Sequence, residues 1–130
     1  MSTIFTKIIN REIPAHFVYE DDVCIAILDK FPVVTGQTLI FPRTAVDYYF
    51  NLDDETLVHL LVVSKKVARA LDKVYGTLRT CVAIEGFEVP HAHIKLYPLI
   101  TVGFQVHGGK EASDADLAHE ADKIKAMLAK

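Results

Sequence analysis

The sequence predicts an α+β domain with a mainly antiparallel, five-stranded sheet and two helices. Short runs of β-branched and aromatic residues follow one another with links of hairpin length. One long segment, residues 54–75, instead repeats its apolar residues at helical spacing. With 130 residues, 51% of them apolar and 24% charged, the chain is long enough for one domain with its own core. We predict that domain over residues 1–130, with 99–130 forming a C-terminal loop and helix.

The first half of the chain predicts a short helix followed by three strands. Apolar residues recur at helical spacing over residues 4–13, and Pro14 ends that pattern. Residues 17–20 and 23–28 are rich in β-branched and aromatic residues and predict a hairpin. Residues 38–41 predict a third strand.

The second half predicts one long helix, two paired strands and a C-terminal helix. Asp53 is the expected N-cap of the long helix, and Gly76 is its expected C-terminal stop. The buried stripe of this helix is expected to consist of Leu57, Leu60, Leu61, Ala68, Leu71 and Tyr75. Residues 78–84 predict a strand that pairs antiparallel with the next one. Ser113 is the expected cap of the last helix, whose stripe would consist of Leu117, Ala121, Ile124 and Leu128.

Charge and composition exclude several classes of partner. Lys and Arg number 14 against 17 Asp and Glu, which gives a net charge of −3 without any basic run, so we expect no nucleic-acid partner. The sequence shows neither a signal peptide nor an apolar run of membrane-spanning length, which predicts a cytoplasmic protein with no membrane partner. Cys24 and Cys81 lie in apolar runs and predict buried, reduced thiols rather than a disulfide.

The most informative segment alternates polar and apolar residues from His91 to Tyr97, between Pro90 and Pro98. Successive side chains of a strand point to opposite faces, so this pattern predicts a half-buried strand. Its core face would carry Ala92, Ile94 and Leu96. Its polar face would carry His91, His93, Lys95 and Tyr97.

That polar face suits chemistry on a phosphate group. A neutral imidazole is a nucleophile near neutral pH, and a lysine adds a fixed positive charge for phosphate oxygens. Asp29, at the end of an apolar strand, could accept hydrogen bonds from a sugar diol. The alternatives are a polar strand face turned to water and an aspartate that only caps its loop. A metal site on His91 and His93 is a further alternative, but no suitable third ligand follows closely in the sequence.

The segment His91-Ala92-His93-Ile94-Lys95-Leu96 resembles the signature of the histidine triad (HIT) superfamily, which is His-x-His-x-His followed by two apolar residues. The resemblance extends upstream and covers roughly residues 3–100. The upstream segments that carry it are residues 4–15, 18–22, 28–29, 32, 36–42 and 52–55. The resemblance implies a HIT-like fold whose sheet continues across a homodimer.

The same resemblance implies a nucleotidyl hydrolase or transferase that acts on purine nucleotides. His93 would attack the α-phosphorus of a phosphoramidate, ester or anhydride and form a nucleotidyl-His intermediate, and His91 would orient the site. Asp29 would hold the ribose. The base pocket would consist of Phe5, Ile8, Ile27 and Leu28. Members of the family generally need no metal or other cofactor for this step, so none is expected.

Departures from the family pattern leave a second function open. Lys95 replaces the third histidine, while Phe87 and Glu88 stand where members often carry phosphate-contacting Gln and Ser residues. The zinc ligands of some members are replaced by Thr6, Gln37 and Ala45, so no structural zinc is expected. The alternative to an enzyme is a nucleotide-binding module of the same fold with weak or no catalysis. No role is assigned to His59 or to His107, and His107 is expected to be solvated.

Overall fold

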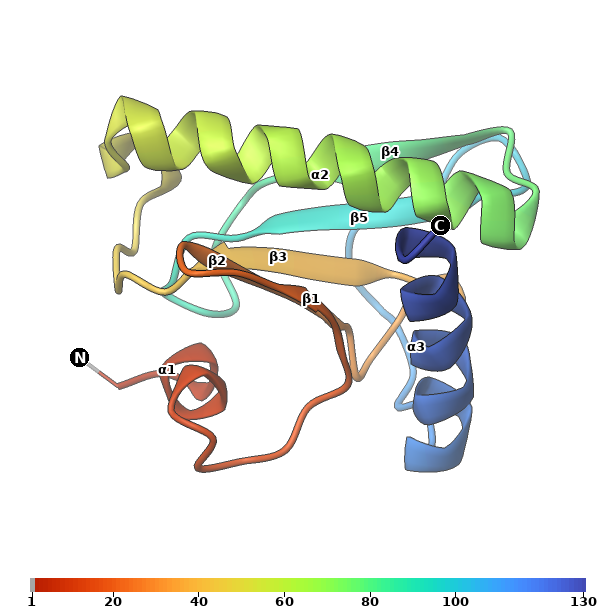
Figure 1. Cartoon of the computed structure of the whole chain (residues 1–130), viewed down its shortest axis with the longest axis horizontal. Coiled ribbons are helices and arrows are strands. Elements are labelled where there is room, and N and C mark those ends of the chain that lie inside the picture. Colours follow the sequence, from red (N-terminus) through yellow and green to blue (C-terminus); the bar gives the residue numbers. More distant parts are fainter. Residues whose placement is uncertain (1) are drawn as a thin grey trace.

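The computed structural model describes residues 2–130, and Met1, which belongs to the predicted domain, lies outside them. Figure 1 shows helices packed around a central sheet. In the described residues the elements follow in the order α1 (Ile4–Ile9), β1 (Phe17–Glu20), β2 (Cys24–Leu28), β3 (Thr38–Pro42), the 3-10 helix η1 (Tyr49–Asn51), α2 (Asp54–Tyr75), β4 (Arg79–Ala83), β5 (Ile94–Leu99) and α3 (Asp114–Leu128).

The sheet has the strand order β1-β2-β3-β5-β4, and every neighbouring pair is antiparallel. The predicted α+β fold with a five-stranded sheet is therefore confirmed. In the described residues three α-helices, rather than two, accompany the sheet. The additional helix is α1, which the sequence predicts as a short helix over residues 4–13. It ends earlier, at Ile9, because Arg11 adopts a left-handed backbone conformation with φ of 60°.

The two faces of the sheet have separate cores. One core lies between the sheet and helices α2 and α3, and its residues from β2 and β3 include Ala26, Leu28 and Ile40. The other lies between the sheet and α1 and consists of Phe5, Ile8, Ile25, Ile27, Leu39 and Phe41. Consecutive residues of β2 and β3 alternate between the two cores, so both strands are buried throughout. Figure 1 shows α1 and α2 on opposite sides of the sheet.

Strand β5 corrects the prediction for its segment in two respects. Both histidines of the segment precede the strand, and the whole segment 91–99 is buried on both faces rather than on one. The alternation itself is confirmed, since the core beneath α2 and α3 contains Ala92, Ile94 and Leu96. Pro98 lies inside the strand instead of ending it. The pairing of β5 with β3 reaches only Leu96, so the missing N–H of Pro98 interrupts no second ladder.

Helix α2 has the predicted ends and, apart from Leu61, the predicted stripe, since Leu57, Ala68 and Tyr75 also pack against the core. The Asp53 side chain accepts a hydrogen bond from the Thr56 N–H, and Gly76 ends the helix in the left-handed conformation. The buried residues are Leu60, Val63, Ser64, Val67, Ala70 and Leu71. Leu61 is 48% exposed, because residues 57–63 are almost all apolar and do not define a single helical face. Among residues 2–130, no helix combines the length and the apolar character needed to cross a bilayer.

Candidate functional site

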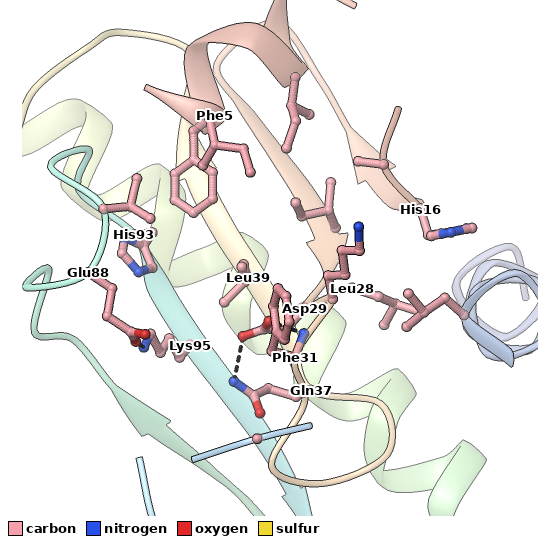
Figure 2. Close-up of a pocket in the computed structure, with 18 of the residues that line it drawn as sticks. Phe5, His16, Leu28, Asp29, Phe31, Gln37, Leu39, Glu88, His93 and Lys95 are labelled. Carbon is pink, nitrogen blue, oxygen red and sulfur yellow. Dashed lines mark hydrogen bonds and ion pairs between the residues drawn. The ribbon is translucent and has the colours of Figure 1, made fainter. Parts of the chain in front are cut away.

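A cavity of about 710 Å³ opens on the face of the sheet that carries α1. Residues of α1, the β2–β3 connection, segment 88–95 and loop 106–109 line it. The cavity brings together most of the side chains that the sequence predicts for the functional site. They are Phe5, Ile8, Ile27, Leu28, Asp29, His93 and Lys95. His91 is the exception and does not line the cavity. Figure 2 shows His93 just before the start of β5 and Lys95 on it, with Asp29 and Gln37 facing them.

One wall of the cavity is apolar and partly aromatic. Phe5 stacks on Phe41 with ring centroids 4.4 Å apart, and the His93 ring lies edge-on to Phe5 at 5.0 Å. Ile8 and Ile27 belong to the same core cluster and also line the cavity. Burial of a planar ligand ring against such a wall contributes about 25 cal/mol per Å² of apolar surface, so this wall can bind an aromatic base.

Opposite this wall, Asp29 is held by its own loop. Its Oδ1 accepts a hydrogen bond from the Phe31 N–H at 2.8 Å, and its Oδ2 accepts one from the Gln37 amide nitrogen at 2.9 Å. The Gln37 side-chain oxygen in turn accepts from the Val33 N–H at 2.7 Å. Burial raises the pKa of the Asp29 carboxyl above its ordinary value, although the Phe31 N–H opposes this shift. Each carboxylate oxygen keeps a lone pair for a further donor, such as a sugar hydroxyl.

The two histidines are fixed by main-chain carbonyl groups. His93 Nδ1 lies 2.7 Å from the His91 carbonyl oxygen, and His91 Nε2 lies 2.8 Å from the Pro42 carbonyl oxygen. A carbonyl oxygen only accepts, so each of these nitrogens carries a proton. Burial lowers the pKa of both imidazoles below the ordinary value. In the neutral His93 ring the lone pair is therefore on Nε2, as a nucleophile requires.

The far end of the cavity carries a cluster of four charged or ionisable side chains. The Lys95 ammonium, only 4% exposed, lies 3.1 Å from Glu88 Oε1 and 4.0 Å from Glu85 Oε1. His107 contacts both glutamates, with Nε2 at 2.6 Å from Glu85 Oε2 and Nδ1 at 2.8 Å from Glu88 Oε1. The hydrogen bond from Lys95 is the main cause that lowers the pKa of the Glu88 carboxyl.

Sequence reasoning missed several residues of this site. His107 is half exposed, in agreement with the predicted solvation, but its contacts with two carboxylates were not predicted. Glu85 and Glu88 received no role, and Gln37 entered only as a replaced zinc ligand. The available signal was weak: Gly108 and Gly109 follow His107 and mark a tight segment, yet they do not indicate what that segment contacts.

The fold and the cavity together define a class of protein, an α+β domain whose pocket combines an apolar wall with a carboxylate, an imidazole and a lysine. A family model described as HIT domain matches residues 10–99. A HIT-like protein of Borreliella burgdorferi is 38% identical over 102 residues, which are 73% of each chain. A HIT-like protein of Bartonella henselae, described as involved in cell-cycle regulation, superposes with a TM-score of 0.89 at 29% identity, covering 97% of this chain and 96% of that one. A HIT family hydrolase of Legionella pneumophila gives a TM-score of 0.66 at 29% identity over 74% of this chain and 91% of that one.

The chain therefore belongs to the HIT family. Membership supports a general nucleotide-binding function. The cavity agrees with that function, because it combines an apolar wall, a carboxylate and a buried imidazole.

Proposed function

We propose that this protein is a nucleotidyl hydrolase or transferase that acts at the α-phosphate of purine nucleotides. His93 is the nucleophile, Asp29 binds the ribose, and the apolar wall around Phe5 receives the purine ring. The substrates are nucleoside phosphoramidates, esters or anhydrides, which all carry a leaving group on the α-phosphorus.

The observation that carries the proposal is the hydrogen bond from His93 Nδ1 to the His91 carbonyl oxygen. It leaves the Nε2 lone pair on a ring that lines the same cavity as Asp29. The phosphate of a nucleotide is joined to its ribose by one short CH₂–O link. A single cavity of about 710 Å³ can therefore hold the sugar at the carboxylate and the phosphate near the imidazole.

The reaction then has two displacements at phosphorus. In the first, the Nε2 lone pair of His93 forms a bond to phosphorus while the bond to the leaving group breaks. In the second, a water oxygen attacks phosphorus, the phosphorus–nitrogen bond breaks, and the electron pair returns to Nε2. Lys95 supplies positive charge to the phosphate oxygens, and the His91 carbonyl keeps the nucleophilic ring in its tautomer.

The test is a substitution of the nucleophile. His93→Ala should abolish turnover of a purine nucleoside phosphoramidate and leave AMP affinity within about threefold, because the interaction removed acts mainly in the transition state. Wild-type protein quenched during turnover should gain the mass of one nucleoside monophosphate. His119→Ala, at an exposed position of α3, is the matched control. Unchanged turnover by His93→Ala would refute the role of this residue.

A second function, nucleotide binding with weak or no catalysis, is favoured by one observation. The Lys95 ammonium is already paired with Glu88, and a carboxylate there competes with a substrate phosphate for the same cation. A thermal shift with AMP or GMP, without any mass adduct during incubation with substrate, would select this function over the enzymatic one.

We further propose a homodimer whose sheet continues through β4. This strand is an edge of the sheet, and Val82 and Ile84 in and beside it are 53% and 38% exposed. Helix α2, which runs alongside β4 in Figure 1, exposes Val58, Leu61 and Val62. An unpaired edge beside exposed apolar side chains is typical of an interface. Analytical ultracentrifugation should give the mass of a dimer for the wild type and of a monomer for Val82→Glu. A monomeric wild type would refute the dimer.

A further inference from the structure

We propose that His107 is the proton donor to the leaving group, in the role that the third histidine of the motif leaves open. His107 belongs to segment 100–112, which follows β5, and it lines the same cavity as His93. This inference rests on the proposed nucleotidyl transfer to His93, because only such a step creates a leaving group that needs a proton.

Lys95 is poorly suited to that task. Its side chain is buried, and its ammonium group donates to Glu88 at 3.1 Å and lies 4.0 Å from Glu85. A lysine ammonium near neutral pH acts as a fixed charge for phosphate oxygens, whereas an imidazole both gives and takes a proton there. The cluster therefore contains a cation for the phosphate and, beside it, a group for proton transfer.

Glu85 lies beside the His107 ring. The Glu85 side chain is 14% exposed, and its Oε1 accepts a hydrogen bond from the Phe87 N–H at 2.8 Å. Its Oε2 lies at ion-pair distance, 2.6 Å, from His107 Nε2. The hydrogen bond of the ring joins Nδ1 to Glu88 Oε1 at 2.8 Å, and since a carboxylate oxygen only accepts, Nδ1 carries the proton that a substrate would receive. A carboxylate beside an imidazole is a recurrent arrangement at sites of acid–base catalysis.

Glu88 marks the position that a substrate atom would take. Its Oε1 lies 3.1 Å from the Lys95 ammonium and 2.8 Å from His107 Nδ1, so one oxygen atom bridges the two donors. The Glu88 side chain is 61% exposed and can rotate into solvent, which leaves the buried Lys95 ammonium with only the 4.0 Å contact to Glu85 and free to donate to a substrate oxygen. A substrate oxygen or nitrogen beside phosphorus that replaced it would contact both donors.

The segment that carries His107 is attached to the body at two places. The Tyr97 hydroxyl donates to the Val106 carbonyl oxygen at 3.1 Å, and Phe104 packs on the Tyr97 ring with centroids 4.6 Å apart. Gly109 lies so close to the Phe31 and Pro32 backbone that a Cβ atom there would overlap it. His107 is therefore presented to the cavity from a fixed strap, defined here as residues 104–109.

With His107 in this role, every proton transferred in the proposed reaction has a donor and an acceptor. As the Nε2 lone pair of His93 bonds to phosphorus, the phosphorus–nitrogen bond of a phosphoramidate breaks, and its electron pair takes the proton from His107 Nδ1 to release a neutral amine. In the second displacement, neutral His107 takes a proton from the attacking water as the bond between phosphorus and His93 breaks. The products are a nucleoside monophosphate and an amine, and both histidines return to their starting state.

The experiment compares two leaving groups. Adenosine 5′-phosphoramidates of an alkylamine need a proton on the leaving nitrogen, whereas the 4-nitrophenyl ester of AMP releases a stable phenolate without one. His107→Gln should lower kcat/KM for the alkylamine substrate by about 100-fold and for the nitrophenyl ester by less than about threefold. Added imidazole should restore part of the lost turnover in His107→Ala. The matched control is His119→Gln, an exposed histidine on α3, which should leave both substrates unaffected.

The outcomes separate the two proposals. If His93→Ala abolishes turnover of both substrates and His107→Gln lowers kcat/KM only for the amine, both proposals stand. Equal losses on both substrates, or no loss on either, would overturn the role of His107 while the role of His93 remains. If His93→Ala still turns over the nitrophenyl ester at the wild-type rate, the nucleotidyl-His mechanism fails, and the inference about His107 fails with it.

Discussion

The two ends of the cavity are built in different ways. At the end proposed to bind the sugar, here called the sugar end, Asp29 is held by hydrogen bonds from its own loop, and the longest of them spans eight positions, from Gln37. At the end proposed to bind the phosphate, here called the phosphate end, Lys95 of β5 contacts Glu88, and Glu88 in turn contacts His107, 19 positions away. The sugar end is thus formed by contacts within one loop, whereas the phosphate end is formed by contacts among three segments of the chain.

This difference has consequences for binding. A short loop loses little entropy on closure, so the sugar end is already in place before a ligand arrives. At the phosphate end, Lys95 and His107 share the carboxylate of Glu88, so a bound phosphate must take over these contacts. We therefore expect the sugar end to determine affinity and the phosphate end to determine which leaving groups are turned over.

The largest expected effect concerns the sugar end. Asp29→Ala removes the acceptor for the ribose hydroxyls and should weaken AMP binding by about 10- to 100-fold, since hydrogen bonds to a charged group contribute roughly 1.5–3 kcal/mol. Isothermal titration measures the affinity. Asp22→Ala, an exposed aspartate in the β1–β2 turn, is the control. An unchanged affinity for AMP would contradict the assignment of the ribose to Asp29.

The next prediction concerns the strap, residues 104–109, which connects the two ends of the cavity. Gly109→Ala places a Cβ atom against the Phe31 carbonyl oxygen, which belongs to the Asp29 loop. Overpacking of this kind costs about 1–3 kcal/mol of unfolding free energy, and the displaced strap should also lower turnover of the amine substrate. Urea denaturation and kcat/KM measure the two effects. Gly103→Ala is the control, because its Cβ atom would lie in open space, although the φ of 83° at this position also disfavours alanine. Full amine turnover by Gly109→Ala would show that the strap position is irrelevant to catalysis.

Rules that depend only on neighbouring residues predicted the position of Asp29 at the end of its strand. The Asp29 carboxylate follows a continuous apolar strand, and its loop partners lie within a few residues, so sequence spacing alone brings the acceptor to the strand end. The alternation around His93 likewise indicated which side chains share a face, because Ile94 and Leu96 pin the register. The caps at Asp53 and Gly76 followed from single residues.

The phosphate end could not be predicted in the same way. Nothing in the sequence near His107 indicates that its loop folds back onto Glu85 and Glu88, because that approach depends on Tyr97 and on the packing of Gly109. The half-buried strand was wrong for a related reason: on the second face of segment 91–97, Phe5 of α1 contacts both histidines, and residues 104–106 contact Tyr97. The periodicity of a sequence indicates how side chains are oriented within one strand. It does not indicate which other segments cover that strand.

A smaller effect concerns position 95. Lys95→His restores the family motif, and it should raise amine turnover only if no other proton donor is present. We expect no increase in the wild-type background and an increase of about tenfold in His107→Gln, where the new imidazole supplies the missing donor. Steady-state kinetics with the alkylamine phosphoramidate measure both. An equal increase in both backgrounds would mean that the native protein lacks a donor for this step.

The smallest expected effect concerns pH and stability. Burial lowers the folded-state pKa of His91 and His93 below the ordinary 6.5, so the unfolded chain binds more protons than the folded one as the pH falls through that value. Their contribution to the unfolding free energy is complete above pH 6.5 and decreases below it. The raised pKa of Asp29 has the opposite sign, and its contribution is lost as the pH rises from 3.8 through the raised value. Chemical denaturation from pH 8 downward through pH 6.5 follows the loss from the histidines, and comparison with variants assigns it to one of them. His93→Gln should flatten this pH dependence, and His119→Gln should not. A wild-type slope in His93→Gln would show that this imidazole titrates equally in both states.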